Sequence, residues 1–341
     1  MVVTFFIGNG FDLNLGLKTT YKDFYPYFCD HAKESNIILN WLKKDDMNWS
    51  DLELDLGENL EQLPEGEENR FYDDKEELDN LLLEYLENEQ TKVDFTNAEK
   101  ISSELIRSLV YFDKDLNETN KVSINYTLLV YNKPIRFEFI DFNYTNVLDR
   151  IVAITKQEEV NARGDISVAL NEKRDNNQNT LYLGNVSHIH GTVEMEAILA
   201  VNDESQINNA RLQTNPLFLD TFIKSRINTR IGQNKIQKVD HILDESHVVC
   251  IFGMSIGDSD KAWWEKLISW LASDEKNKLV IYHKINEDVL QRRNPSRIIR
   301  IEYEIREDIF SKGKTEKVID KEDSIKQRIF IALNSDIFSF N

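Results

Sequence analysis

The sequence contains few of the residues that hold small or secreted proteins together. It has only 2 cysteines, Cys29 and Cys250, and no CxxC pair, which excludes a disulfide framework or a zinc ribbon and is typical of a reducing cytoplasm. Its 341 residues include 12 glycines and 5 prolines but no linker rich in either, so each glycine cluster marks a special backbone position. No apolar run approaches the roughly 20 residues needed to cross a membrane. We therefore expect a cytoplasmic protein without a membrane anchor.

Positive charge is also scarce. The chain carries 41 Lys and Arg against 60 Asp and Glu, a formal net charge of −19. Residues 45–89 hold 18 of the acids against Arg70 and Lys75, a net charge of −16, so the rest of the chain is nearly neutral. Because nucleic-acid binding depends on Lys and Arg that neutralise phosphates, we expect no direct binding to duplex DNA or RNA.

Short apolar runs rich in β-branched and aromatic residues alternate with amphipathic stretches. This alternation predicts a doubly wound, mostly parallel Rossmann-like α/β sheet. We expect strands at residues 2–7, 135–142, 197–201, 247–252, 278–282 and 298–303, and a short hairpin from 181–183 and 187–190. We expect helices at residues 144–155, 218–243, 258–271, 286–294 and 321–333, and a polar loop at 161–180.

Residues 20–115 interrupt the alternation with mostly helical, acidic sequence. Helices are expected at 20–43, 49–63, 75–86 and 98–111, and leucines recur at helical spacing at Leu52, Leu56, Leu60 and Leu63. We therefore expect a Rossmann-like nucleotide-binding core formed by residues 1–19 and 116–341 and a helical acidic insert formed by residues 20–115. The leucine stripe is typical of core packing; the alternatives are a lid over the ligand or the interface of a homo-oligomer.

The first candidate motif, GNGFD at residues 8–12, follows the first expected strand and opens a helix. Mononucleotide-binding folds place their phosphate loop there, because glycines allow a tight turn and the helix offers free N–H groups. Leu13 stands where a full GxGxxG has its third glycine, so a plain turn with Asp12 as a helix cap is the alternative. The predicted ligand contacts in this loop are Gly8, Asn9, Gly10, Phe11 and Asp12.

Two more polar turns follow expected strands, at the ends where open α/β sheets bind ligands. FNYTN at residues 142–146 offers the side-chain amide of Asn143 as donor and acceptor, unless Asn143 or Thr145 caps the next helix. FGMSIGDSD at residues 252–260 offers Ser255 and Asp258 to ribose hydroxyls, with a loop and capping acids as the alternative.

The fourth motif, SHIHG at residues 187–191, places His188 and His190 on the same side of a strand. Histidine titrates near neutral pH and therefore suits a general base. A histidine pair with this spacing also suits a metal, but no His, Cys or carboxylate pattern nearby completes a ligand set, so we predict none. A structural histidine is the alternative, and the adjacent Gly191 favours a functional role.

The order IGNGFD, FNYTN, HIHG and FGMSIGDSD, with NWSDLE (residues 48–53) in the insert, resembles the bacterial abortive-infection family AbiH. These motifs are in turn similar to those of sirtuin-like NAD hydrolase domains. The resemblance extends from the N-terminus to about residue 270. It implies an antiphage effector that binds NAD+ and hydrolyses it to nicotinamide and ADP-ribose.

The resemblance also implies roles for individual residues. Asn143 would hold the ribose or the attacking water, and His190 would act as the base. The implied contacts to NAD+ outside the first loop are Tyr144, Thr145, Gly191, Gly253, Ser255 and Asp258. The chain departs from sirtuins at Asn9, where they have alanine, and at Thr145, where sirtuin-like domains have aspartate. It also lacks their four-cysteine zinc module, which argues against protein deacetylation.

Two other functions remain open at this point. The first is a non-catalytic sensor that binds NAD+ or ADP-ribose and acts through a partner. The second is a metal-dependent nuclease that uses the acids of residues 45–89, although such runs are usually solvated surface. For the hydrolase we expect NAD+ as substrate and no further cofactor. We also expect the activity to be restrained until a phage-derived trigger releases it.

Overall fold

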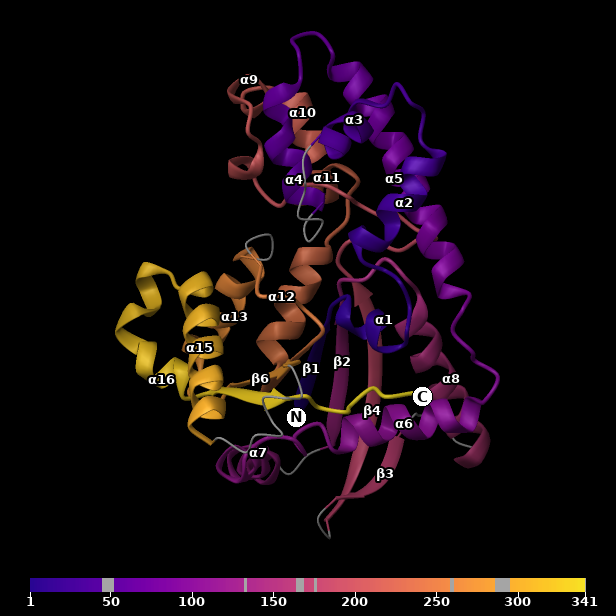
Figure 1. The fold of residues 1–341 in the computed structure, drawn as a ribbon. Coiled ribbons are helices and arrows are strands. Elements are labelled where there is room, and N and C mark those ends of the chain that lie inside the picture. The colour runs from indigo at the N-terminus through magenta and orange to yellow at the C-terminus, as the bar shows by residue number, and fades with distance from the viewer. Residues whose placement is uncertain are drawn as a thin grey trace.

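The computed structural model describes residues 1–44, 52–131, 134–163, 169–174, 177–257, 261–285 and 295–340. A seven-stranded sheet lies at its centre, with the strand order β3-β4-β2-β1-β5-β6-β7 (Figure 1). The strands are β1 (Val2–Ile7), β2 (Ile135–Asp141), β3 (Ala169–Arg174), β4 (Asn177–His188), β5 (Val248–Phe252), β6 (Lys278–His283) and β7 (Ile329–Leu333).

The strand order identifies the fold class. β3 pairs antiparallel with β4, and the five other neighbouring pairs are parallel. Numbered in chain order, the six parallel strands lie as 3-2-1-4-5-6, which is the order of the Rossmann fold. The predicted doubly wound, mostly parallel sheet is therefore confirmed. The order reverses between β1 and β5, so the ligand-binding crevice of this fold class is expected at their carboxyl ends.

The described helices cover both faces of the sheet and form a second body above it (Figure 1). Those numbered up to eight are α1 (Gly10–Asn14), α2 (Tyr21–His31), α3 (Ile37–Lys44), α4 (Leu52–Asn59), α5 (Glu68–Gln90), α6 (Ala98–Val110), α7 (Glu118–Tyr131) and α8 (Val147–Arg163). The others are α9 (Ala210–Gln213), α10 (Pro216–Phe222), α11 (Lys224–Arg230), α12 (Lys235–Glu245), α13 (Lys261–Ser273), α15 (Pro295–Gly313) and α16 (Glu322–Lys326).

The central strands are apolar on both faces because each face has its own core. Successive side chains of a strand point to opposite faces, and on β1 Phe5 enters the core shared with α6 and α8, whereas Phe6 enters the core shared with α12, α13 and α15. Phe5 lies 6.0 Å from Phe139 of β2, centroid to centroid, and Phe6 lies 6.3 Å from Trp263 of α13.

A third core belongs to the helical lobe, which we define as α2–α5 with α9–α11. Its buried side chains come from residues 24–86 and from residues 199–223. The predicted leucine stripe is buried here, so it is core packing: Leu52, Leu56, Leu60 and Leu63. The predicted insert of residues 20–115 is thus divided, because α6 packs on the sheet rather than in the lobe.

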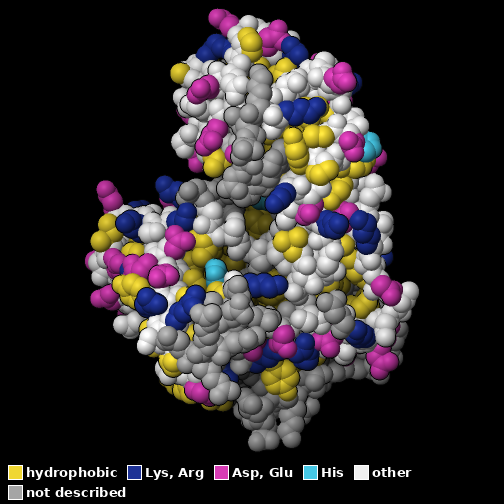
Figure 2. All heavy atoms as spheres, in the orientation of Figure 1, with side chains coloured by type: hydrophobic (Ala, Val, Ile, Leu, Met, Phe, Trp, Pro, Cys, Tyr) yellow, Lys and Arg dark blue, Asp and Glu magenta, His cyan; other side chains and the backbone are white. Residues whose placement is uncertain are grey.

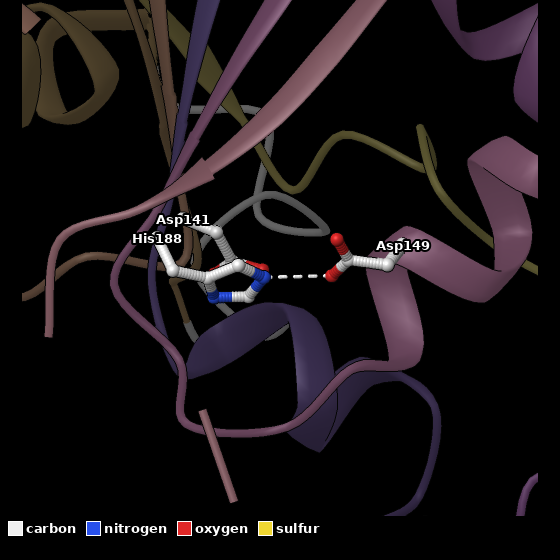
Figure 3. Close-up of side chains that lie close together, drawn as sticks. All are labelled: Asp141, Asp149 and His188. Carbon is white, nitrogen blue, oxygen red and sulfur yellow. Dashed lines mark hydrogen bonds and ion pairs between the residues drawn. The ribbon is translucent and has the colours of Figure 1, made fainter. Parts of the chain in front are cut away.

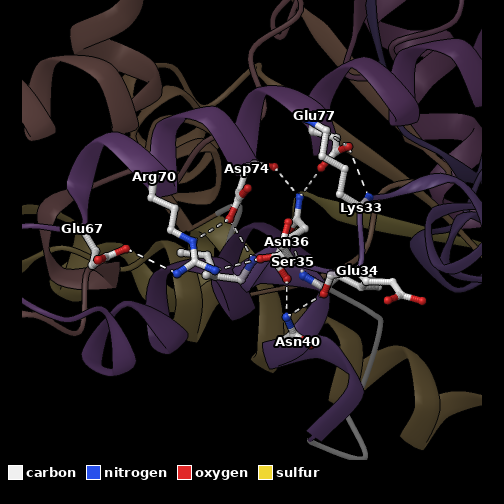
Figure 4. A network of polar contacts seen from close by, with 11 residues as sticks. Lys33, Glu34, Ser35, Asn36, Asn40, Glu67, Arg70, Asp74 and Glu77 are labelled. Atoms are coloured by element: carbon white, nitrogen blue, oxygen red, sulfur yellow. Dashed lines mark hydrogen bonds and ion pairs between the residues drawn. The ribbon is translucent and has the colours of Figure 1, made fainter.

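Polar groups of α5, including acidic residues, bind the loop between α2 and α3. Asn36, which is fully buried, accepts a hydrogen bond from the N–H of Leu39 and donates to the carbonyl of Asp74 and to a carboxylate oxygen of Glu77. Arg70 donates to the carbonyl of Ser35 (Figure 4). The acids of this stretch therefore serve as internal partners of the loop between α2 and α3, and not only as solvated charges.

Several sequence predictions about the sheet are wrong. Residues 161–180 are not all loop, since they contain β3 and the start of β4. Residues 181–190 do not form a hairpin, because 177–188 is one strand paired with β2 and interrupted only by a register shift. Residues 197–201 form no strand; Val201 makes an isolated bridge to Ile223. Pairing decides the two strand cases: β3 pairs with β4, the next strand in the chain, and β4 also pairs with β2, which is more than 40 residues away.

Two predictions near the C-terminus are also wrong: an expected strand is part of a helix, and an expected helix contains a strand. Residues 298–303 alternate like a strand but lie inside α15, whose buried residues Ile305, Ile309 and Phe310 follow the helical period. Residues 321–333 contain the short helix α16 and then β7, not one helix. β7 is a five-residue apolar run, too short to distinguish a strand from a buried helix by its pattern. The helix expected at 286–294 lies outside the described residues.

Candidate functional site

Four predicted motifs follow the carboxyl ends of neighbouring strands. Ile7, the last residue of β1, is paired with Asp141 of β2 and with Phe252 of β5, and Asp141 is paired with His188 of β4. The turns after these strands therefore meet at one edge of the sheet, around the switch point. Figure 2 shows a hollow between the helical lobe and the part of the molecule that contains the sheet.

The glycine loop after β1 packs directly against the loop after β5. The N–H of Gly8 donates to the carbonyl of Phe252 at 2.9 Å, and the N–H of Gly10 donates to the carbonyl of Gly253 at 2.8 Å. A Cβ on Gly10 would lie 2.5 Å from the Cα of Gly253. The glycines thus allow two backbones to meet, and their N–H groups already have acceptors within the protein. Phosphate binding by this loop stays a prediction.

Replacing Gly253 with alanine tests this close approach. Gly253 has a φ of +73°, and its Cβ would lie 2.7 Å from the Cα of Gly10. Gly232 is a matched control, because its φ is +75° and a Cβ there has nothing within 4 Å. We expect both variants to lose about 1–2 kcal/mol from left-handed backbone strain, and Gly253→Ala to lose about 1–3 kcal/mol more from overpacking. The free energy of unfolding in urea measures both losses. Equal losses for the two variants would show that the contact between Gly253 and Gly10 is not tight.

Asn143 joins the loop after β2 to the loop after β1. Its side chain is 5% exposed and donates to the carbonyl of Gly8 at 3.3 Å. Next to it, the hydroxyl of Thr145 donates to a carboxylate oxygen of Asp12 at 2.7 Å. The alternative that Asp12 caps the helix after β1 is wrong, because the N-cap of α1 is Asn9.

Two carboxyl groups are buried at this edge. Burial raises the pKa of Asp12 to about 7, although the Thr145 hydrogen bond and the charge of His188 act against it. Burial raises the pKa of Asp141 to about 8, against the charge of His188 and the hydrogen bond from the N–H of Asn143. One oxygen of each carboxyl is buried with no hydrogen-bond partner among the described residues, Asp12 Oδ1 and Asp141 Oδ2.

The raised pKa of Asp12 makes stability depend on pH. The folded protein binds this proton more tightly than the unfolded chain, so the stabilisation is complete below the unfolded pKa and is lost as the pH rises through about 7. The Asp12→Asn variant retains an acceptor for Thr145 but has no proton to lose. In metal-free buffer we expect the wild type to lose about 2 kcal/mol relative to this variant between pH 5 and pH 8. The free energies of unfolding in urea measure this. The same difference between the wild type and the variant at both pH values would contradict the assignment.

The two histidines occupy different environments. His188 Nδ1 lies 3.1 Å from the carbonyl oxygen of Asn143, and its Nε2 lies 2.7 Å from Oδ2 of Asp149 on α8 (Figure 3). Burial alone lowers the pKa of His188, but the hydrogen bond to Asp149 and the charge of Asp141 outweigh it, so the pKa is raised. Both ring nitrogens face acceptors, which favours the protonated form of His188 and fixes the orientation of its ring.

His190 is the free base of the pair. Burial lowers the pKa of His190 well below its ordinary value, and the charges of Lys224 and Lys235 lower it further. Its ring packs edge-on against Phe142, 5.7 Å between centroids, and lies 6.2 Å from Tyr144. Within the described part of the chain no hydrogen bond holds its ring. His190 is thus kept in its neutral form, because burial and the two lysines disfavour the protonated ring.

Sequence reasoning missed the charged pair that connects the helical lobe to this edge. Glu53 of α4 and Lys224 of α11 are 8% and 6% exposed, and Lys224 Nζ donates to Glu53 Oε2 at 2.5 Å. The hydroxyl of Tyr144 lies 3.1 Å from Glu53 Oε1 and 3.0 Å from the carbonyl oxygen of Ile198. Glu53 belongs to the NWSDLE element, but in a run of 18 acids it could not be distinguished from solvated charge.

The other predicted site residues lie in varied places. Asn9 exchanges hydrogen bonds with Thr19, accepting from its hydroxyl at 2.5 Å. Phe11 is fully buried and packs against Phe252 and Phe338. Gly191 has a φ of +79°, and a Cβ there would lie 2.1 Å from a backbone oxygen, so only glycine fits. Ser255 is exposed at the edge of the sheet, and Asp258 lies outside the described residues.

The family model "Bacteriophage abortive infection AbiH" matches residues 4–283. The chain belongs to the AbiH family. The match contains all four strand-end turns and the helical lobe, and it ends with β6, so β7 and α15 lie beyond it. Membership of AbiH gives the protein a role in abortive infection by bacteriophage. Comparison with curated proteins finds no match.

None of the helices in the described ranges combines the length and the apolar character that a membrane span requires. The apolar side chains of these helices instead supply the three cores described above.

Proposed function

We propose that this AbiH protein cleaves the nicotinamide–ribose bond of NAD+ and releases nicotinamide and ADP-ribose. Cleavage of this bond builds positive charge on the ribose, as in glycoside hydrolysis. The electron pair of the broken C–N bond leaves with nicotinamide, which departs neutral. A water molecule then forms the new bond to C1′ and gives up one proton. The protein must hold the ribose, aim the water and accept that proton.

The observation that carries the proposal is the neutral, unpaired imidazole of His190 beside the loop of Asn143. Both residues follow neighbouring parallel strands, at the edge where a Rossmann-like fold binds nucleotides. His190 would accept the proton of the attacking water, and a general base of this kind contributes about 10²–10⁴-fold. Asn143 would orient the water or a ribose hydroxyl, exchanging its present hydrogen bond to Gly8 for the ligand.

Purified protein incubated with NAD+ tests the proposal directly. We expect nicotinamide and ADP-ribose to appear in equal amounts when the products are separated by chromatography. The Asn143→Ala variant should lack this activity while retaining the circular dichroism spectrum of the wild type. Product formation by that variant at the wild-type rate would remove Asn143 from the mechanism.

A sensor that binds NAD+ or ADP-ribose without cleaving it is the second candidate. The hydrogen bond already made by the side chain of Asn143 favours it, because this bond must open before the amide can orient a water molecule for catalysis. Calorimetric titration with NAD+ and with ADP-ribose separates the candidates. Saturable binding of both ligands without product formation would favour the sensor. The protein should then also form no product in extracts of phage-infected cells, which supply a trigger.

The nuclease alternative receives less support. Several acids of the stretch 45–89 serve as internal partners: Glu53, Asp74, Glu77 and Glu89. Their carboxylates face helix N-termini, loops and lysines rather than one another, which does not suit a shared metal ion for phosphate chemistry. Nuclease assays with and without a chelator test this alternative. Nuclease activity that is lost with the chelator would support it.

A further inference from the structure

A second cluster of side chains at the same edge is not used by the proposed cleavage. Asp141 and His188 are register partners on β2 and β4, and Asp149 reaches them from the first turn of α8 (Figure 3). One ligand-type atom from each residue lies within 4.8 Å of the other two. We propose that Asp141, His188 and Asp149 bind one divalent transition-metal ion, such as Zn2+ or Mn2+.

The orientation of His188 supports this site. Its Nδ1–H points at the carbonyl oxygen of Asn143, 3.1 Å away, which leaves Nε2 directed at Asp149. Histidines that bind metals usually donate their other N–H to a carbonyl or carboxylate in this way, because the bond fixes the ring and its tautomer. The metal ion takes the place of the proton between Nε2 and the Asp149 carboxylate, and that proton is released to solvent.

Asp141 gives an independent indication that this cluster binds a ligand. Its side chain is 1% exposed; Oδ1 accepts the N–H of Asn143 at 2.9 Å, while Oδ2 is buried with no hydrogen-bond partner among the described residues. Buried carboxylates in proteins are normally paired or bound to metal. Asp12 adds a second such oxygen nearby, so this edge holds three carboxyl groups for one imidazole.

The donor set indicates the class of ion. One imidazole nitrogen with two carboxylates suits Zn2+ and other first-row transition metals, whereas Ca2+ and Mg2+ are held by oxygen ligands. Asp141 is buried and Asp149 is partly exposed, its side chain 40% accessible. An ion can therefore reach this cluster from solvent on the side of Asp149.

Metal binding by chelator-treated protein tests the site. We expect calorimetric titration with Zn2+ or Mn2+ to give one ion per chain, with Mg2+ and Ca2+ binding far more weakly. The His188→Gln and Asp149→Asn variants should each weaken binding at least about 100-fold. Asp149→Asn is the safer variant for folding, because this side chain is partly exposed and the amide retains the shape of the carboxylate.

His241→Gln is the matched control, since this histidine is exposed on α12, its side chain 75% accessible, and lies outside the cluster. Its affinity for Zn2+ should equal that of the wild type. Wild-type binding no tighter than that of Asp149→Asn would overturn the proposal, and the cluster would then be a hydrogen-bonded ionic network. The titrations contain no NAD+, so their outcome does not depend on the proposed cleavage.

Discussion

Replacing His190 with glutamine should lower the rate of NAD+ cleavage by about 10²–10⁴-fold, the usual contribution of a general base. The reason is that glutamine has a similar volume and polarity but accepts no proton at neutral pH. His190 is 8% exposed, so the substitution leaves the surface unchanged. Initial rates of nicotinamide release at saturating NAD+ measure the effect.

Two controls make this result specific. His241→Gln removes an exposed histidine and should leave the rate unchanged. Binding of ADP-ribose to the His190→Gln variant should stay within a few-fold of the wild type, because the base acts in the chemical step. A His190→Gln variant that cleaves NAD+ as fast as the wild type would exclude His190 as the base.

Replacing Lys224 with methionine should destabilise the protein by about 3–5 kcal/mol, because it leaves the Glu53 carboxylate buried without its cationic partner. The side chains of Lys224 and Glu53 are 8% and 11% exposed, so water cannot replace the lost interaction without opening the lobe. The free energy of unfolding in urea, compared with that of the wild type, gives the cost.

The double variant Lys224→Met with Glu53→Gln separates the charge from the packing. Its amide oxygen still accepts the hydroxyl of Tyr144, and no charge remains unpaired. Replacing both partners of a buried pair is often nearly neutral, so the double variant should recover most of the lost stability. If it is no more stable than Lys224→Met alone, the cost comes from lost packing around the lysine stem.

Periodicity in the sequence was enough to predict the fold class, and turn chemistry selected the turns that the structure brings to one edge of the sheet. The apolar run at residues 2–7 predicts a central strand, and polar turns after three such runs predict where ligands bind. Because parallel strands place their carboxyl ends at one edge, turns more than 100 residues apart in the chain are brought together, as Ile7 and Asp141 are. These inferences need only local pattern and the general geometry of parallel sheets.

Only the tertiary structure decided the environment of each candidate residue. His188 and His190 are two residues apart and indistinguishable in sequence, yet Asp149 raises the pKa of His188, while burial and the charge of Lys224 lower the pKa of His190. In the same way, a remote pairing partner makes residues 329–333 a strand, and Lys224 gives Glu53 a structural role. The physical reason is that protonation, pairing and burial depend on neighbours distant in the chain, which no local pattern specifies.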